Sequence, residues 1–465
     1  MGKPTAVLLG SMMGNFDEIA EVEDLRQSKD LYLNFLNKIE KKIEIFCEVL
    51  NLGITGNEKD SENIKKNVLF RKTDMIIIVP MTYTLDSVIS TLLSSNKKPV
   101  ILLSSEMIKY IPSDSDFFFM MTYGPIASIS SLTNILIKMY QKYDLIIGDI
   151  DDEKTITELK NSIDAAKAFS YLEKSVIGLI GNNYPGMNCL KIEKEILKKD
   201  LKIKLKEISY QEIIREYKSA KENEVKIKIK KINEFNTESL KEDDIIKNAR
   251  LSVAIEKIAI KHKINCFAQL CQPMIIEREI GFPPCIAFSL LHEEGIMTIC
   301  EYDIANACLM VIFKNIFLDA FFSEFYVHDT NNNYIFCSHC GMANINFCSK
   351  KNLININTNP CYQGINNGGL SFHFQADPGH YILGSMTQIN GKLRIIAGNV
   401  ENLVMENFQS KTPQFNLRFK NRDVKTNFRK YCLSGGVHHF IVAKGGTIEP
   451  LIKFCDYSAI ELFIL

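Results

Sequence analysis

The sequence has no net charge, and no stretch of it forms a clear basic face. Lysine plus arginine and aspartate plus glutamate number 55 each over 465 residues. A nucleic-acid-binding protein normally shows a basic excess, and a protein that lies on a membrane normally shows a basic amphipathic segment. We therefore expect a neutral or weakly charged small molecule as the partner, with no nucleic acid and no membrane.

Long apolar runs and targeting signals are also missing. The apolar runs at 75–81 and 308–313 are far shorter than the ~20 residues that span a bilayer. The N-terminus lacks a secretory signal, and Ala6 stands where a myristoylation signal needs serine or threonine. The 13 cysteines are irregularly spaced and odd in number, which is typical of reduced core thiols rather than of a disulfide framework. These absences predict a cytoplasmic globular protein.

The first part of the chain alternates apolar runs with polar stretches of helix length. Runs rich in valine, isoleucine and leucine occur at 5–10, 42–50, 74–81 and 99–105. Continuous apolar runs that alternate with helices indicate a parallel sheet covered on both faces. Residues 1–172 are therefore predicted to form an N-terminal doubly wound α/β domain.

A second block of the same kind begins near residue 173. Its predicted strands lie within 174–187, 202–209, 263–271 and 295–303. The Lys- and Glu-rich segment 210–262 has apolar residues at helical spacing, which favours solvated amphipathic helices over a binding patch. Residues 173–325 are predicted to form a central doubly wound α/β domain.

The pattern changes from about residue 326 onward. Asparagine, glycine and proline become frequent, and short alternating runs occur at 368–375, 380–389 and 392–400. Asn390-Gly391 joins the last two runs and is a strong hairpin signal. Residues 326–465 are therefore predicted to form an antiparallel, β-barrel-like or sandwich-like C-terminal domain.

Two carboxylates follow the apolar run 296–300, where ligands collect in open α/β sheets. Asp303 directly precedes a predicted helix at 305–317, so it either caps that helix or binds a ligand. Glu301 lies nearer to the strand end and is the better candidate for a functional role.

Three further segments contribute candidate side chains. Glu324 lies in the aromatic segment 321–327, and alone it would be read as a surface acid. His339 lies in an apolar, cysteine-rich run, and alone it would be read as a core histidine. His438 and His439 are adjacent before a β-branched strand, so their side chains point to opposite faces and both can hardly be core. Two histidines with two carboxylates suit Mn²⁺, Co²⁺ or Fe²⁺ better than a thiolate site would.

Two rival sites have weaker patterns. Cys337, Cys340, Cys348 and Cys361 could form a structural zinc site, but they lack the spacing of paired CxxC motifs. The turn at 182–187 could bind phosphate, but it lacks both the GxGxxG glycines and the P-loop lysine.

These segments together resemble the L-arabinose and L-fucose isomerases. The segment 299–303 is similar to the family's A-E-G-D and T-E-N-D segments, and 435–439 is similar to its G-G-A-H-H segment. Glu324 and His339 fall where the family carries its second acidic ligand and the histidine of a G-S-H or G-A-H segment. Tyr302 departs from the family's usual glycine or asparagine.

The resemblance implies a metal-dependent aldose–ketose isomerase that works through a cis-enediol. It implies Glu301, Glu324, His339 and His439 as metal ligands, with the two glutamates also moving the proton. His438 and Asp303 are then expected to bind substrate. It further implies a homo-trimer or homo-hexamer with shared active sites. The substrate would be a pentose or a 6-deoxyhexose of the L-fucose, D-arabinose or L-arabinose type.

Two other functions are compatible with the same residues. A non-catalytic sugar-binding or regulatory protein would bind a sugar without needing the metal. A metal-dependent hydrolase or aldolase-like lyase would use the same four ligands but would cleave its substrate.

Overall fold

The computed structural model describes residues 2–14, 23–67, 70, 72–276, 279–359, 368–405, 410–420, 423–458 and 460–465. The chain forms two compact units: unit 1 comprises Met1–Tyr171 and Glu449–Ala459, and unit 2 comprises Leu172–Ile448 and Ile460–Leu465. No helix among the described residues is long and apolar enough to cross a membrane. The three predicted domains, 1–172, 173–325 and 326–465, stay a prediction.

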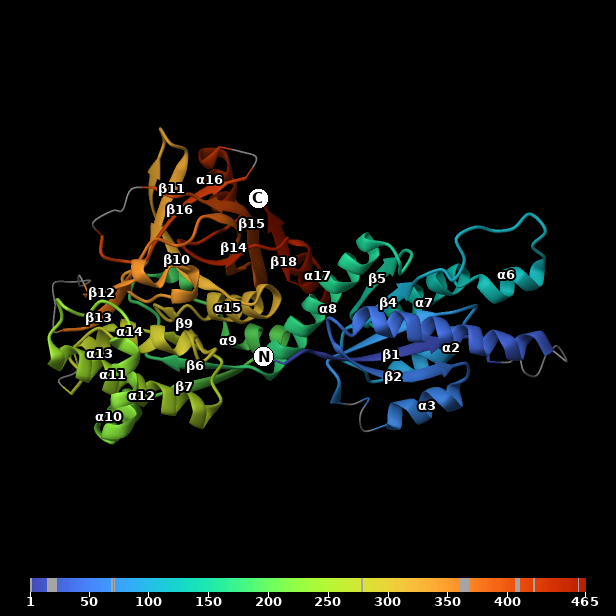
Figure 1. The fold of residues 1–465 in the computed structure, drawn as a ribbon, viewed down its shortest axis with the longest axis horizontal. Helices are drawn as coiled ribbons and strands as arrows, with labels where there is room; N and C mark the ends of the chain where they lie inside the picture. The colour runs from blue at the N-terminus through green and yellow to red at the C-terminus, as the bar shows by residue number, and fades with distance from the viewer. Residues whose placement is uncertain are drawn as a thin grey trace. The chain divides into compact units, whose positions relative to one another are not determined.

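Unit 1 contains a five-stranded parallel sheet with the order β2-β1-β3-β4-β5 (Figure 1). Its strands are β1 (Thr5–Ser11), β2 (Glu48–Thr55), β3 (Met75–Pro80), β4 (Val100–Ser104) and β5 (Tyr143–Ile147). Its helices are α2 (Glu23–Ile43), α3 (Glu58–Lys66), α5 (Asp86–Leu93), α6 (Phe117–Tyr123), α7 (Ile126–Lys138), α8 (Glu153–Lys174, which ends in unit 2) and α17 (Glu449–Ser458). Consecutive side chains of β3 are fully buried although they point to alternate faces, so both faces are covered. The predicted parallel sheet is confirmed.

Two details of unit 1 differ from the prediction. The apolar run at 42–50 is not one strand, because α2 continues to Ile43 and β2 begins only at Glu48. Strand β5 was not predicted, since its short run Tyr143–Ile147 has a charged residue at its second position.

Unit 2 contains a four-stranded parallel sheet with the order β7-β6-β8-β9. Its strands are β6 (Val176–Ile180), β7 (Lys204–Ile208), β8 (Cys266–Gln269) and β9 (Met297–Cys300). Its helices are α10 (Tyr210–Lys218), α11 (Glu222–Ile232), α12 (Glu242–His262), α13 (Gln272–Ile276), α14 (Cys285–Ser289) and α15 (Ile304–Phe317). The Lys- and Glu-rich segment therefore forms helices, as predicted.

A seven-stranded sheet makes up much of the rest of unit 2, with the order β14-β17-β10-β11-β16-β15-β18 and a further pairing of β14 with β15 (Figure 1). Its strands are β10 (Phe321–Asp329), β11 (Tyr334–Ser338), β14 (Gly379–Ile389), β15 (Lys392–Asn402), β16 (Gln414–Phe419), β17 (His439–Lys444) and β18 (Glu461–Ile464). The pairing of β18 with β15 is parallel, whereas the others are antiparallel. The sheet is therefore mixed, and the prediction of a purely antiparallel domain is wrong in this respect.

Several short elements complete unit 2. Strands β12 (Asn355–Thr358) and β13 (Leu370–His373) form a separate two-stranded sheet, and α16 (Val424–Leu433) precedes β17. The remaining short helical segments are η1 (Asn188–Leu190), α9 (Lys194–Ile196), η2 (Leu197–Leu201), η3 (Leu290–His292), η4 (Ile345–Phe347) and η5 (Lys351–Leu353).

The predicted hairpin at Asn390-Gly391 is confirmed. Strands β14 and β15 pair from Gly379↔Asn402 to Ile389↔Lys392. Asn390 and Gly391 have φ of 50° and 76°, the positive values that a two-residue hairpin turn of this kind requires. Asparagine tolerates this region and glycine adopts it freely, which is why this dipeptide forms the turn.

Aromatic side chains pack together in the core beside β10 and β16. The ring of Phe321 packs edge-on against Phe347 and Phe415, with centroids 5.2 and 4.9 Å apart. Edge-to-face pairs at this spacing are favoured because the positive ring edge meets the negative ring face. Phe321 faces this core, so Phe322 and Glu324, at the next alternate positions of β10, both point to the opposite face of the strand.

Candidate metal centre

Glu301 lies on the tight link between β9 and α15. Glu301 and Tyr302 have φ of 60° and 59°, in the left-handed region that non-glycine residues seldom adopt. Such strained positions persist only where the surrounding structure holds them, and they are frequent at functional sites. The amide of Tyr302 donates to the carbonyl of Gln269 at 3.2 Å, which ties this link to the end of β8.

The seven-stranded sheet aligns the second carboxylate with a histidine. Glu324 of β10 is directly opposite His439 of β17 in the strand register, so their side chains share one face. His439 Nε2 lies 3.2 Å from both Glu301 Oε2 and Glu324 Oε1. The imidazole of His439 is fully buried, and these two distances place its Nε2 between the two carboxylates.

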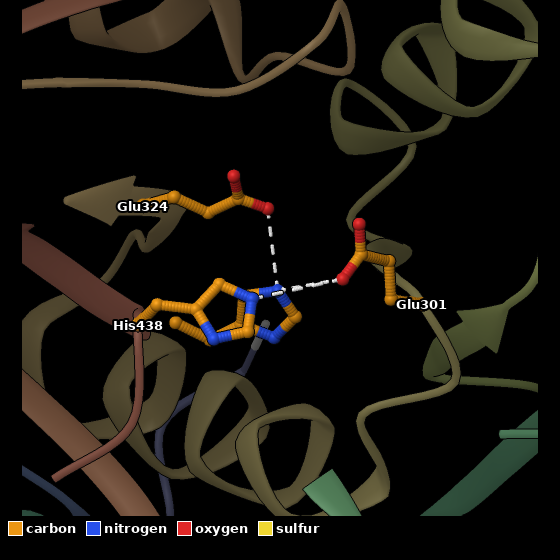
Figure 2. A group of neighbouring side chains, drawn as sticks. Glu301, Glu324 and His438 are labelled. Atoms are coloured by element: carbon orange, nitrogen blue, oxygen red, sulfur yellow. Dashed lines mark ion pairs between the residues drawn. The ribbon is translucent and has the colours of Figure 1, made fainter. Parts of the chain in front are cut away.

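His438 reaches the same place from the residue before β17. Figure 2 shows the side chains of Glu301, Glu324 and His438 directed toward one another. His438 Nε2 is 3.8 Å from Glu301 Oε2, and the two adjacent imidazole rings have centroids 4.1 Å apart. Glu301, Glu324, His438 and His439, named here the carboxylate–histidine group, each offer one ligand atom within 4.8 Å of the others.

His339 is close to this group but faces it differently. Its Nδ1 lies 2.9 Å from Glu324 Oε1, and its Nε2 lies 3.5 Å from the Sγ of Cys340. The structure therefore brings His339 to Glu324, whereas His438 takes a place among the four mutually close ligand atoms. The metal role predicted for His339 and the substrate role predicted for His438 both stay predictions.

Asp303 caps the following helix, the first of the two alternatives that the sequence left open, and it also contacts His439. Its Oδ1 accepts the amide of Asn306 at 3.0 Å, which is an N-cap of α15. Its Oδ2 lies 2.8 Å from His439 Nδ1 and, since a carboxylate accepts, the imidazole donates there. This contact leaves His439 Nε2 directed at the glutamates, the arrangement in which a carboxylate orients a metal-binding histidine.

Tyr326 and Phe322 belong to the site but were not predicted. The hydroxyl of Tyr326 donates to Glu324 Oε2 at 2.6 Å. The ring of Phe322 packs edge-on against both His339 and His439, at 4.8 Å in each case. The available signal was the period of two along β10, which places residues 322, 324 and 326 at alternate positions.

Charges within the group are strongly coupled. Burial raises the pKa of the Glu301 carboxyl, but the facing imidazoles of His438 and His439 outweigh it and lower that pKa to about 2. Burial likewise opposes ionisation of Glu324, whose pKa nevertheless lies well below its usual range because His339 and His439 face it. Burial lowers the pKa of His439, but Asp303 and the two glutamates raise it well above the ordinary value.

The group fits a divalent cation. Glu301 Oε2 and His439 Nε2 are buried and have no hydrogen-bond partner among the described residues, although they lie 3.2 Å apart. Buried polar atoms normally have a partner, so two of them facing each other indicate a site for a third group. Two carboxylates and imidazoles supply oxygen and nitrogen ligands together.

The cysteine alternative is not represented in this group. The cysteines outside the masked ranges, Cys337, Cys340 and Cys348 among them, are free thiols, while Cys361 lies outside the described residues. The part of the chain that the structure describes contains one cluster with metal-ligand geometry, and it holds no cysteine.

Comparison with known proteins agrees with the resemblance. Residues 319–461 match the family model of the L-arabinose isomerase C-terminal domain. This range contains Glu324, His339, His438 and His439 but not Glu301.

Two curated relatives are sulfoquinovose isomerases, from Priestia aryabhattai and from Priestia megaterium (strain ATCC 12872 / QMB1551). Each is 25% identical over 191 residues, which covers 40% of this chain and 42% of the relative. The match thus spans less than half of the length of these relatives.

Among solved structures, a solute-binding protein of an ABC transporter from Burkholderia multivorans is 12% identical. The alignment covers 68% of this chain and 93% of that chain, with a TM-score of 0.17. A similarity at this level carries no argument about the fold.

Proposed function

We propose that the chain is a divalent-cation-dependent aldose–ketose isomerase of the L-arabinose and L-fucose isomerase superfamily, because residues 319–461 match the family model of the L-arabinose isomerase C-terminal domain. One observation carries the proposal: buried ligand atoms of Glu301, Glu324 and His439 converge, and two of them have no hydrogen-bond partner among the described residues. An isomerase of this type needs a cation and a proton-transferring carboxylate side by side.

Glu301, Glu324 and His439 would hold the cation, for which Mn²⁺, Co²⁺ or Fe²⁺ suits the donor set. The bound cation would polarise the two sugar oxygens next to the reacting carbons. The fourth ligand is His438, which lies in the carboxylate–histidine group, or His339, which the resemblance implies. His438→Ala and His339→Ala distinguish the two, because only loss of a ligand removes Mn²⁺ binding in a calorimetric titration.

The glutamates would move the proton. One carboxylate takes the proton from C2 of the open-chain aldose while O1 gains a proton, which gives the cis-enediol. C1 then gains a proton while O2 loses one, which gives the ketose. Tyr326 holds Glu324 through its Oε2, while Oε1 faces His339 and His439. Asp303 orients His439, so its contacts favour a positioning role over the predicted substrate contact. His438 is half-exposed and can orient substrate hydroxyls if it is not a ligand.

The seven-stranded sheet carries two residues of the site, Glu324 on β10 and His439 on β17. Each of its strands from β14 to β15 has at least two neighbours, since β14 also pairs with β15. We infer from this ring of pairings that the sheet closes as a barrel, as the sequence predicted. A closed barrel would fix Glu324 and His439 rigidly against Glu301.

The proposed substrate class is a pentose or 6-deoxyhexose of the L-fucose, D-arabinose or L-arabinose type. Sulfoquinovose joins this panel because the curated relatives are named for it. We also propose a homo-trimer or homo-hexamer with shared active sites. Sedimentation of the active protein tests this, and an active monomer contradicts it.

The function is tested by ketose formation across that panel. EDTA-treated protein is assayed with and without added Mn²⁺, and the product is identified by mass. Metal-dependent formation of a ketose of unchanged mass from one sugar supports the isomerase. Cleavage products favour the hydrolase or lyase, and sugar binding without metal or turnover favours the binding protein.

A further inference from the structure

The loop that follows β8 carries two glutamines with no role in the site described above. Gln269 is the last residue of β8 and is opposite Cys300 of β9, the residue that precedes Glu301. Gln272 is the first residue of α13. The carbonyl of Gln269 accepts the amide of Tyr302 at 3.2 Å, so this loop is held against the link that presents Glu301.

The side-chain amide of Gln269 is only half satisfied. The residue is 2% exposed, and its Nε2 lies 3.0 Å from the Sγ of Cys300. Its Oε1 is buried and has no hydrogen-bond partner among the described residues. Exchanging the oxygen and nitrogen of the amide would not change this, because one end would still face the thiol and the other would still lack a partner.

Gln272, three residues further along the chain, also has a side-chain oxygen, Oε1, that is buried and lacks a hydrogen-bond partner in the described part of the chain. Cys271, between the two glutamines, is partly exposed. Burial raises the pKa of the Cys271 thiol, and the neighbouring Cys300, Cys340 and Glu301 raise it further. The loop therefore lies beside the carboxylate–histidine group and reaches solvent at Cys271.

We propose that Gln269 and Gln272 form a recognition subsite for hydroxyl groups of an open-chain polyhydroxylated sugar. The direction of the sugar, with its reacting carbons at Glu301 and Glu324, rests on the proposed function. A hydroxyl both donates and accepts hydrogen bonds, as a carboxamide does. Two neutral side-chain amides therefore suit a ligand with hydroxyl groups better than a ligand with an anionic group. A site that bonds a hydroxyl rejects the analogue that lacks it far more strongly than an apolar pocket rejects a missing methylene.

The test combines a side-chain change with matched changes in the sugar. Mn²⁺-loaded full-length protein, Gln269→Leu and Gln272→Leu are compared on the parent sugar and on its 3-, 4- and 5-deoxy analogues. We expect each variant to lose about 10- to 100-fold in kcat/KM on the parent sugar, mainly through KM, and to be unchanged on one deoxy analogue. Equal losses on every sugar, or no loss, overturn the proposal while leaving the isomerase function intact.

Asn315→Leu is the matched control. Asn315 is a buried amide of α15 whose Oδ1 likewise lacks a partner among the described residues, and its Nδ2 donates to the carbonyl of Val311 at 2.8 Å. It lies twelve positions beyond Asp303, about 18 Å along the helix. Its replacement is expected to affect all sugars alike, which separates loss of recognition from a general loss of packing.

A binding measurement keeps the proposal testable without turnover. Calorimetric titration of the Mn²⁺-loaded protein with pentitols and hexitols reports recognition of an open-chain polyol directly. Binding that is weaker by at least about tenfold in Gln269→Leu than in Asn315→Leu supports the subsite even if no ketose forms. Failure of the unmodified protein to bind any of these polyols overturns it.

Discussion

Asp303 shows two structural tasks performed by one carboxylate. One oxygen caps α15, which is one of the two sequence-based alternatives, and the other holds His439. Ligand binding by Asp303 stays a prediction. Composition and spacing could not reveal this, because the second contact joins residues 136 positions apart in the chain. Glu301 was easier to predict, since it stands at the carboxyl end of a buried strand.

The hydrogen bond from His439 to Asp303 leads to a prediction about metal affinity. Asp303→Asn keeps a helix-capping oxygen but no longer enforces the imidazole orientation, so Mn²⁺ affinity should fall about 10- to 100-fold. Calorimetric titration measures it. Asp423→Asn is the control, because Asp423 caps α16 at Thr426 in the same way without contacting the group. Equal affinity in Asp303→Asn and the unmodified protein would count against the orienting role.

Tyr326 and Phe322 contact the site, but the sequence does not predict that they do. Both lie on β10 beside Glu324, and an aromatic residue between apolar neighbours is ordinarily a core residue. Their contacts with Glu324 and the histidines depend on the pairing of β10 with β17. The sequence alone does not state that pairing.

At the scale of elements, the apolar runs predicted most strands of the two parallel sheets, and a dipeptide predicted a hairpin. The failures have a physical cause. The apolar run at 42–50 spans the end of α2 and the start of β2, and periodicity cannot separate a buried helix end from a strand start. Strand β18 joins the sheet in parallel with β15 after α17, and such long-range pairing has no local signal.

The turn between β14 and β15 gives a stability prediction. Gly391→Ala forces an alanine to φ of 76°, which should lower the free energy of unfolding by about 1–2 kcal/mol. Asn390→Gly should change it little, because glycine adopts this region freely. Urea unfolding followed by circular dichroism compares the two. A neutral Gly391→Ala would mean that the strand pairing, rather than the turn, sets this geometry.

The packing of α10 on α12 gives a pH prediction. Hydrogen bonds from Lys261 and then His262 lower the pKa of Glu212 to about 2, against the opposing effect of burial. A carboxyl with a depressed folded-state pKa stabilises the fold above its unfolded-state pKa and loses that contribution as pH falls through the folded value. The stabilisation should therefore be full at pH 6 and decline between about pH 4.5 and 2.

Glu212→Gln tests this difference. The variant should be less stable than the unmodified protein by roughly 0.2–1 kcal/mol at pH 6, and the difference should shrink toward pH 3. Glu216→Gln on the same helix is the control, since no ion pair of Glu216 occurs among the described residues. A difference that does not depend on pH would contradict the ion-pair explanation.

At the scale of the whole molecule, the chain crosses between units near its end. α17 belongs to unit 1, whereas β18 and the residues after it belong to unit 2. The predicted domain order along the chain does not include this return, because nothing in the local sequence marks it. The carboxylate–histidine group lies entirely within unit 2.

Metal binding should therefore stabilise unit 2. At a free Mn²⁺ concentration of about 100 times Kd, ligand linkage adds about 2.7 kcal/mol to the free energy of unfolding. EDTA should remove this gain, and Glu301→Gln should not show it. Thermal unfolding with Mn²⁺ or EDTA measures both. If Mn²⁺ stabilised Glu301→Gln as much as the unmodified protein, the cation would bind at a site that does not include Glu301.

The central claim is that Glu301 and Glu324 transfer the proton beside a bound cation. It is tested most directly by ketose formation from the best sugar of the panel, comparing the Mn²⁺-loaded protein with Glu301→Gln and Glu324→Gln. Circular dichroism confirms that the variants are folded. Both variants are predicted to lose turnover by about 10²- to 10⁴-fold, the usual contribution of a general acid–base group. Near-normal turnover by either variant would contradict the account.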